Sequence, residues 1–353
     1  MSRKTVPDPI FTWHNLQPGV GSLQWIQLHP PNNNADAKFG IIVGTGDGKV
    51  VGLDWKTKRE RFRLDVGSSS ILSCSLLPDF RLCAFERTRG VHLMQLSAER
   101  NTRVENKAFL RTSHYGFCAA DCAPTTSSCT HTLVVPNLRG SEQSQLDIYL
   151  LDVHSIETSA IRTVDLSLSS CETSNAKKRG QPLALKLIAD SDWCLIGFEN
   201  GTLSCYNIRT CSETSHLDGL HSDAVFCLDY VQPTGYSGST NNTLVRWTIG
   251  HQGQLSLHPS PLTSLAVCTP SPTGVSCVRI RPSDVKLVAV GCWDGLVRLF
   301  STKSHRKLAV IDWHKGTIAA MAFCQFALPD QALRPWLAVG SKDGTLSVWD
   351  LYS

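Results

Sequence analysis

Two groups of polar residues in this chain of 353 are of the types that proton-transfer chemistry uses. One group is His314, Asp343 and Trp349, and a similar group upstream is His221, Ser237, Asn241 and Trp247. A histidine beside a carboxylate can act in acid–base catalysis. Buried polar groups, however, normally exist to satisfy one another. We therefore interpret both groups as structural hydrogen-bonded ties and predict no catalytic residue.

Two further stretches are similar to catalytic or cofactor motifs only in composition. The segment Gly44 to Gly48 is rich in glycine, but it leads into a strand pattern, whereas phosphate binding needs the N-terminus of a helix. The serine of Tyr236-Ser237-Gly238 lacks the glycine two places later that a hydrolase elbow carries. The sequence therefore predicts a protein that is not an enzyme and has no cofactor.

Cysteine usage favours a reducing compartment over a metal or disulfide framework. The chain has 14 cysteines and no Cys-x-x-Cys pair, and most cysteines stand singly in apolar strands. The one arrangement that could hold zinc is Cys118, Cys122, Cys129 and His131. Because its spacing matches no usual structural zinc site, we predict no metal.

The elements that position these residues come from an internal repeat. Each clear copy has a small residue, then Asp-Gly or Asn-Gly, then an alternating strand that ends in a bulky residue. An Asx-Gly pair between apolar runs favours a tight hairpin, because its central residues need positive φ. The clear copies are Gly44–Gly48, Gly197–Gly201, Gly291–Gly295 and Gly340–Gly344.

Three weaker copies bring the repeat to seven, and the hairpins follow alternating strands with no helical period. The bulky residues that close the third strand are Leu53, Met94, Leu151, Tyr206, Trp247, Phe300 and Trp349. These repeats resemble WD repeats and predict an all-β, seven-bladed WD40 β-propeller. We expect one domain over residues 10–353 after a flexible stretch 1–9, with blades ending near residues 54, 96, 152, 207, 248, 301 and 350.

The last copy stops after three strands, so the sequence leaves its outer edge unpaired. An unpaired edge is prone to aggregation. Residues 10–14, Ile-Phe-Thr-Trp-His, are a short apolar and aromatic stretch ahead of the first blade. We expect this N-terminal strand to join the last blade and close the propeller.

Composition excludes several classes of protein. With 42% hydrophobic and 18% charged residues, the chain can bury a large core. A net charge of +4 is too balanced to indicate a nucleic-acid footprint, although Lys56–Arg63 and Lys177–Arg179 are basic runs. No stretch has the length of a membrane helix or the pattern of a signal peptide. We expect a cytoplasmic and nuclear protein that binds neither membrane nor nucleic acid directly.

The chain resembles one WD-repeat family, the guanine-nucleotide-binding-protein beta-subunit-like protein of animals and the fungal ASTRA-associated protein. The segments that carry the resemblance are Tyr115–Cys118 with Leu133–Pro136, Gly291–Phe300, and Gly340–Trp349. The resemblance implies a scaffold or adaptor, a monomeric propeller within a complex and without a small-molecule substrate. It also implies protein partners: the TTT co-chaperone complex, the large phosphatidylinositol-kinase-related kinases, and components of the chromatin-linked ASTRA assembly.

Two other functions stay open. A substrate receptor of a cullin ubiquitin ligase commonly carries Trp-Asp-x-Arg after a third strand, and the nearest match is Tyr206-Asn207-Ile208-Arg209. A G-protein beta-type subunit needs a long N-terminal helix to hold a gamma subunit. About ten residues precede the closing strand, fewer than the ~12–15 of a stable isolated helix, and Pro7 and Pro9 are among them.

Trp293 and Phe198 are the candidate partner-binding residues. Both stand at otherwise polar turns, and exposed aromatic rings commonly anchor interfaces. The alternative is that they pack against a neighbouring blade, the commoner fate of large rings.

Overall fold

The computed structural model of the chain describes most of its residues. They are residues 8–28, 38–77, 81–96, 104–113, 116–124, 130–139, 143–152, 160–166, 179–257, 264–266, 273–325 and 335–351. Within these ranges the secondary structure is entirely β, in seven sheets. No helix in this part of the chain is long and apolar enough to cross a membrane.

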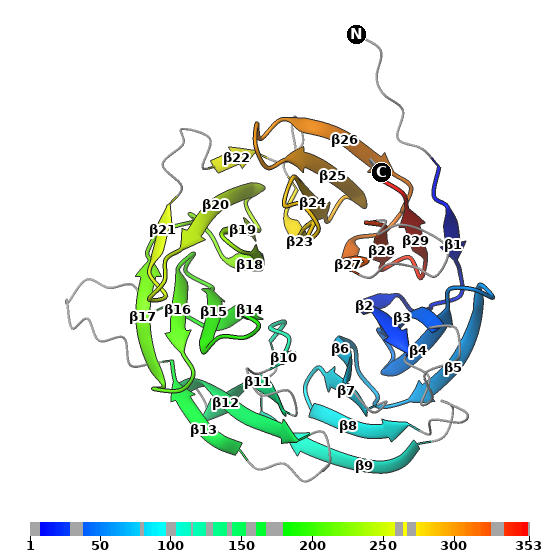
Figure 1. Cartoon of the computed structure of the whole chain (residues 1–353), viewed down its shortest axis with the longest axis horizontal. Coiled ribbons are helices and arrows are strands. Elements are labelled where there is room, and N and C mark those ends of the chain that lie inside the picture. The colour runs from blue at the N-terminus through cyan, green and yellow to red at the C-terminus, as the bar shows by residue number, and fades with distance from the viewer. Residues whose placement is uncertain are drawn as a thin grey trace. The chain divides into compact units, whose positions relative to one another are not determined.

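Each sheet forms one blade, and the first three blades follow the order of the sequence (Figure 1). Blade one contains β2 (Val20–Leu28), β3 (Lys38–Thr45), β4 (Lys49–Asp54) and β5 (Arg59–Asp65). Blade two contains β6 (Ile71–Leu77), β7 (Arg81–Glu86), β8 (Gly90–Leu96) and β9 (Val104–Arg111). Blade three contains β10 (Asp121–Pro124), β11 (Thr130–Arg139), β12 (Gln143–Asp152) and β13 (Ala160–Asp165).

Blades four to six continue this order, and blade five has two short outer strands that both pair with its third strand. Blade four contains β14 (Pro182–Leu187), β15 (Trp193–Phe198), β16 (Leu203–Asn207) and β17 (Ser212–Leu217). Blade five contains β18 (Val225–Val231), β19 (Thr234–Ser239), β20 (Thr243–Ile249), β21 (Leu255–Leu257) and β22 (Ser264–Ala266). Blade six contains β23 (Val275–Ile280), β24 (Leu287–Cys292), β25 (Leu296–Ser301) and β26 (Lys307–Asp312).

Blade seven joins the two ends of the described chain. It contains β27 (Ile318–Phe323), β28 (Leu337–Ser341), β29 (Leu346–Trp349) and, outermost, β1 (Phe11–Trp13). β1 pairs antiparallel with β29, with Thr12 opposite Ser347. The fold is therefore an all-β, seven-bladed β-propeller closed by the N-terminal strand, which confirms the predicted fold class.

The hairpins between second and third strands form where the Asx-Gly pairs stand. In blade seven Gly344 has a φ of +81°, and in blade five Asn242 takes the equivalent place with a φ of +69°. Glycine adopts this left-handed region without strain, and asparagine tolerates it better than most residues. A Cβ on Gly344 would lie 2.4 Å from the Gln17 side chain. The turn therefore needs glycine for its φ, whereas the end of the flexible Gln17 side chain could move aside.

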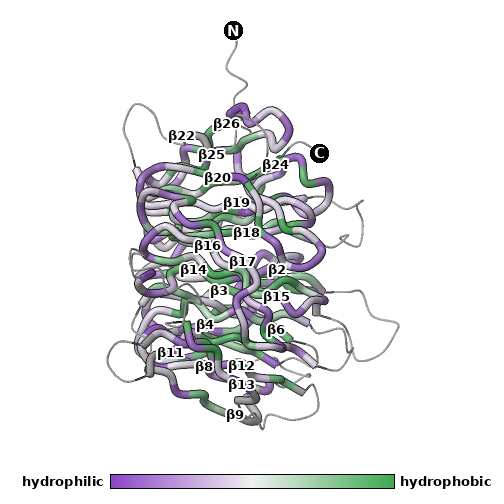
Figure 2. Tube along the Cα trace, turned by 90° about the vertical axis from the view of Figure 1, so that its left-hand side faces the viewer, coloured by the Kyte–Doolittle hydropathy of each residue, from purple (hydrophilic) through white to green (hydrophobic). Residues whose placement is uncertain are grey.

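Contacts group the residues into two compact units. One comprises Met1–Glu86, His92–Phe109 and Arg279–Ser353, and the other comprises Arg87–Val91 and Leu110–Val278. In the first unit, Trp13, Leu16 and Trp25 belong to a core cluster shared by blades one and seven. In the second, Val134 and Ile196 belong to a cluster shared by blades three and four. Hydrophobic and hydrophilic stretches alternate along the chain (Figure 2). The limits of a single domain at residues 10 and 353 stay a prediction.

Candidate functional site

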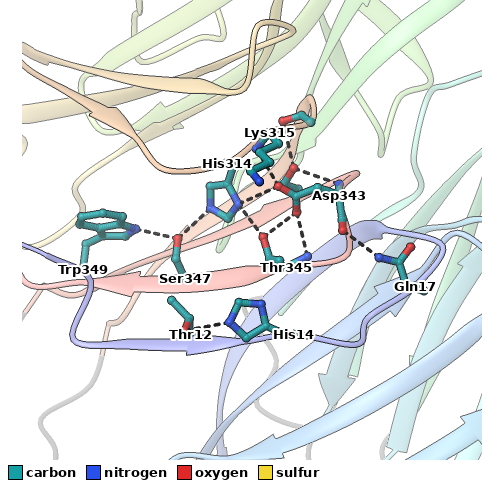
Figure 3. Close-up of polar contacts among 11 residues, drawn as sticks. Thr12, His14, Gln17, His314, Lys315, Asp343, Thr345, Ser347 and Trp349 are labelled. Atoms are coloured by element: carbon teal, nitrogen blue, oxygen red, sulfur yellow. Dashed lines mark hydrogen bonds and ion pairs between the residues drawn. The ribbon is translucent and has the colours of Figure 1, made fainter.

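The first polar group forms a chain of hydrogen bonds in blade seven (Figure 3). His314 lies between β26 and β27, and its Nδ1 is 2.8 Å from Thr345 Oγ1. Its Nε2 is 2.8 Å from Ser347 Oγ, which also accepts a hydrogen bond of 2.7 Å from Trp349 Nε1. Thr345 Oγ1 donates to Asp343 Oδ1 over 2.5 Å. The structure thus brings His314, Asp343 and Trp349 into one network, but Thr345 and Ser347 make its direct links.

Asp343 also fixes the backbone around His314. Its Oδ2 accepts a hydrogen bond of 2.8 Å from Lys315 N, and its Oδ1 accepts one of 2.9 Å from Thr345 N. The distance from Asp343 Oδ2 to His314 Nδ1 is 3.6 Å, which is longer than a hydrogen bond. The carboxylate therefore acts on His314 through Thr345 and through the loop that carries the ring.

The hydrogen-bond directions define the proton positions on His314. A carboxylate only accepts, so Thr345 donates its hydroxyl proton to Asp343 and must accept from Nδ1–H. Ser347 accepts from the indole N–H of Trp349 and donates its own proton to Nε2. A neutral ring protonated at Nδ1 satisfies every group in this network, and its side chain is 0% exposed. Burial lowers the pKa of His314, and the nearby Asp343 opposes this only in part.

The second group repeats this pattern in blade five. His221 Nδ1 is 2.9 Å from Thr243 Oγ1, and Nε2 is 2.9 Å from Ser237 Oγ. Thr243 Oγ1 donates to Asn241 Oδ1 over 2.6 Å, so Asn241 takes the place that Asp343 has in blade seven. Asn241 Nδ2 donates in turn to Ser222 Oγ. Burial lowers the pKa of His221 to about 4.

The blade-five network excludes Trp247, which corrects one part of the sequence interpretation. Ser237 lies on β19, the strand next to that of Trp247, whereas Ser347 lies on β29, two residues before Trp349. No described residue accepts a hydrogen bond from Trp247 Nε1. Trp247 packs instead by its rings: it stacks on Tyr230 at 6.0 Å and covers Gly235, whose Cβ would lie 2.1 Å from the indole.

The two networks take their serine from opposite members of one cross-strand pair. Ser237 is paired with Val245 in blade five, and Val339 is paired with Ser347 in blade seven. Directly paired residues of an antiparallel sheet point to the same face. The hydroxyl therefore reaches the histidine from either strand, but only the third-strand serine also binds the tryptophan.

Because the serine can stand on either strand of the pair, a second substitution should partly restore the stability that is lost when Ser347 is removed. Ser347→Val should lower the free energy of unfolding by about 1–2 kcal/mol, because it leaves His314 Nε2 and Trp349 Nε1 buried without a partner. Adding Val339→Ser should recover about half of that loss, since the new hydroxyl reaches His314 but not Trp349. Urea unfolding of the two single variants and the double variant measures both effects. A double variant less stable than Ser347→Val would contradict the exchange.

The buried histidines also predict a dependence on pH. The folded pKa of His221, about 4, lies below the value of about 6.5 of an unfolded histidine. The unfolded chain therefore binds more protons between these values, so the contribution of His221 is complete above pH ~6.5 and is lost as pH falls toward 4. We expect the difference in the free energy of unfolding between the wild type and His221→Gln to shrink as pH falls through this window. Urea unfolding at a series of pH values measures it, and a constant difference would contradict it.

Thr345, Ser347 and Thr243 were missed by sequence reasoning, although a signal was present. A threonine stands two places after the Asx of the hairpin in Asp343-Gly-Thr345, Asn241-Asn-Thr243 and Asn200-Gly-Thr202. In blade four, Thr202 N donates to Asn200 Oδ1 over 3.0 Å. The recurrence of Asx-x-Thr at one place in three repeats indicates a role in the turn.

Comparison with known proteins agrees with the repeat pattern over nearly the whole chain. The chain is 26% identical over 358 residues to guanine nucleotide-binding protein subunit beta-like protein 1 of Mus musculus, covering 98% of this chain and 97% of the mouse protein. It is 27% identical over 279 residues to ASTRA-associated protein 1 of Verticillium alfalfae, and this match covers 67% of this chain and 64% of the fungal protein. The chain is thus similar to both proteins, and to the mouse protein over nearly its whole length.

A second fungal relative gives a similar result. ASTRA-associated protein 1 of Schizosaccharomyces japonicus is 27% identical over 261 residues, covering 69% of this chain and 66% of the fungal protein. The match to these two fungal relatives thus covers slightly less than two thirds of their length. No protein-family model matches the chain.

The two candidate partner-binding residues differ in their exposure to solvent. Trp293, in the hairpin between β24 and β25, is 42% exposed. Phe198, at the end of β15, is 0% exposed and belongs to the core cluster of blades three and four. The prediction that Phe198 contacts a partner was therefore wrong. Its strand ends inside the packed blade, before the polar turn begins.

The candidate zinc ligands of this WD-repeat chain lie only partly within the described residues. Cys129 lies outside them, and burial with the charge of Asp121 raises the pKa of the Cys118 thiol far above its usual range. Among the described residues no group of three His, Cys, Asp or Glu is placed to hold a metal ion.

Proposed function

We propose that this chain is a non-enzymatic scaffold that brings proteins together in a larger assembly. The observation that carries the proposal is the state of His314 and His221, the best candidates for acid–base chemistry. Each ring is buried and each ring nitrogen already has a hydrogen-bond partner in its own blade. A general base must reach the proton that it abstracts, and these rings face only structural neighbours.

The relatives support a more specific role. Two of them are named ASTRA-associated protein 1, and we propose that this chain likewise associates with ASTRA-like components. As the family resemblance implies, we further propose that it acts with the TTT co-chaperone in the maturation of phosphatidylinositol-kinase-related kinases. A rigid propeller suits this role, because its surface is ordered before a partner binds and little conformational entropy is lost.

Affinity purification at the endogenous level tests the partners. We expect recovery of TTT subunits and large kinases with the tagged chain. Recovery of a cullin adaptor would replace the proposal with a ubiquitin-ligase receptor, and recovery of a gamma subunit would replace it with G-protein signalling. A purification without TTT, kinase or ASTRA components would overturn it.

We propose that Trp293 is one of the partner contacts, since this residue is 42% exposed in a hairpin. Trp293→Ala should reduce partner recovery without lowering the abundance of the chain. Leu308→Ala is the matched control, because Leu308 is 44% exposed on β26 of the same unit. Equal recovery with both variants would remove Trp293 from the contacts.

We propose that the chain occupies both cytoplasm and nucleus. Lys177 and Lys178, the first two residues of the second basic run, lie outside the described residues. Arg179 makes an ion pair of 2.8 Å with Glu213 and its side chain is 11% exposed. Cell fractionation with and without depletion of TTT measures the location and its dependence on partners. A purely cytoplasmic chain would contradict the proposed location.

A further inference from the structure

An exposed phenylalanine lies beside an arginine guanidinium in the second unit. Phe117, in the segment before β10, is 54% exposed, the largest fraction among the exposed large hydrophobic residues of the described chain. The Cζ atom of Arg87 is 4.0 Å from the centroid of the Phe117 ring. The Phe226 ring, on β18, is 6.0 Å away and tilted by 47°. The Phe117 ring is thus contacted by two side chains while much of it faces solvent.

Two more arginines belong to the same end of blade two. Arg87 and Arg89 lie in the hairpin between β7 and β8, and Arg111 is the last residue of β9. The hairpin is bound to this strand end, because Thr112 N donates to Arg89 O over 3.0 Å. Both Arg89 and Arg111 are exposed. We call the set Arg87, Arg89, Arg111, Phe117 and Phe226 the Phe117 surface.

Two described residues near Phe117, one on each side of it in the chain, are held by packing or hydrogen bonding. Cys118, the next residue after Phe117, is 0% exposed. Before it, Ser113 N donates to Asn137 Oδ1 of blade three over 2.8 Å. A Cβ on Gly90 would lie 2.0 Å from Leu110 O, so the hairpin and the end of β9 are in close backbone contact. An exposed ring on an anchored backbone loses little conformational entropy when it is covered, which favours a binding role.

We propose that the Phe117 surface binds an acidic peptide segment of a partner protein. An apolar side chain of the segment packs on the exposed Phe117 ring, and its carboxylates pair with the arginines. The choice of occupant follows from charge complementarity, since guanidinium groups bind carboxylates in a bidentate manner. The exposed residues Arg89 and Arg111 supply these donors, while Arg87 packs on the ring. The proposal rests on the adaptor function proposed above and names one of its surfaces.

The same residue types also occur in sites for single-stranded nucleic acid, but the arrangement favours a peptide. Such sites combine a basic groove with aromatic rings on which successive bases stack. The Phe117 surface offers one well-exposed ring, because Phe226 is only partly exposed. A single ring with arginines beside it matches one apolar anchor among carboxylates.

Fluorescence anisotropy with the full chain tests the proposal. The probe is a short fluorescein-labelled peptide in which aspartates alternate with leucine and phenylalanine. The comparison probes are the same peptide with asparagine for aspartate, the same peptide with glycine for its apolar residues, and a labelled oligothymidylate. We expect saturable binding of the first probe and at least about tenfold weaker binding of the other three. Preferred binding of the oligothymidylate, or no binding of the acidic apolar peptide, would overturn the proposal.

Variants then locate the binding on this surface. Phe117→Ala and the pair Arg89→Gln with Arg111→Gln should each weaken peptide binding by about tenfold. The control is Leu257→Ala, because Leu257 is 51% exposed in the same unit and lies outside the Phe117 surface. Circular dichroism and thermal melting confirm that each variant folds. An equal effect of Leu257→Ala would overturn the assignment.

Affinity purification from cells separates this proposal from the adaptor function. If the wild type recovers TTT and kinase subunits and Phe117→Ala recovers them equally, the Phe117 surface is wrong and the adaptor function stands. If the wild type recovers none of them, the adaptor function is wrong whatever the peptide result. Loss of partners with Phe117→Ala but not with Leu257→Ala supports both.

Discussion

Deletion of residues 1–14 is expected to lower the melting temperature of the protein by about 10 °C. The deletion removes β1 and its hydrogen bonds to β29, together with Trp13, which is 8% exposed in the core of blades one and seven. Loss of a buried tryptophan costs about 3–5 kcal/mol, and each kcal/mol lowers the melting temperature by about 2–4 °C in a chain of roughly this size. Differential scanning calorimetry measures the shift.

A shorter deletion provides the control for this result. Removal of residues 1–7 leaves all of β1, including the hydrogen bond of 2.8 Å from Ile10 N to Val348 O. We expect that variant to have the same melting temperature as the wild type. The longer deletion should also increase aggregation, because it exposes the edge of β29. An unchanged melt after the longer deletion would show that β1 does not stabilise blade seven.

His314→Ala is expected to lower the free energy of unfolding by about 3–4 kcal/mol. Both Thr345 and Ser347 lose a buried partner, at about 1–3 kcal/mol for each orphaned group, and the removed ring leaves a cavity. Urea denaturation at pH 7 measures the loss. A loss of under about 1 kcal/mol would contradict the network, since exposed polar residues usually contribute no more than that.

Asp343→Asn is the matched variant for the same network. Blade five already uses an asparagine there, because Asn241 Oδ1 accepts from Thr243. The amide introduced by Asp343→Asn would keep an acceptor for Thr345 but not for Lys315 N, so we expect a smaller loss than that of Asp343→Ala, about 1 kcal/mol. Asp343→Ala removes every acceptor of this side chain and should cost about 1–3 kcal/mol. Equal losses for the two variants would show that the acceptor for Thr345 contributes nothing to the stability of the loop.

The local turn chemistry made most of the fold predictable. An Asp-Gly or Asn-Gly pair favours a tight turn through the φ angles of its own residues, and the strands beside it alternate in polarity within a few positions. Gly344 and Asn242 illustrate this, since both adopt positive φ where the repeat places them. The closing role of β1 was also predictable, because the last repeat lacked an outer strand and an apolar stretch was available at residues 10–14.

The candidate site was predictable only in part. The recurrence of His314 and His221 at one place in the repeat identified the histidines of both networks. Which hydroxyl meets each ring depends on the strand register, which pairs Ser237 with Val245 and Val339 with Ser347. A sequence pattern does not show that the two members of such a pair can exchange roles. Trp247 was therefore wrongly included in the hydrogen-bonded network.

The all-β class, the seven repeats, the hairpins and the strand that closes the last blade could all be predicted, because each depends on residues close together in the chain or on the count of strands. The exposure of the aromatic rings could not be predicted in this way. Phe198 and Trp293 stand at similar turns, yet one is buried and the other is 42% exposed. Phe117 lies beside Arg87 and Phe226, which are far from it in the sequence. Exposure depends on neighbours brought from other blades, and no local pattern encodes them.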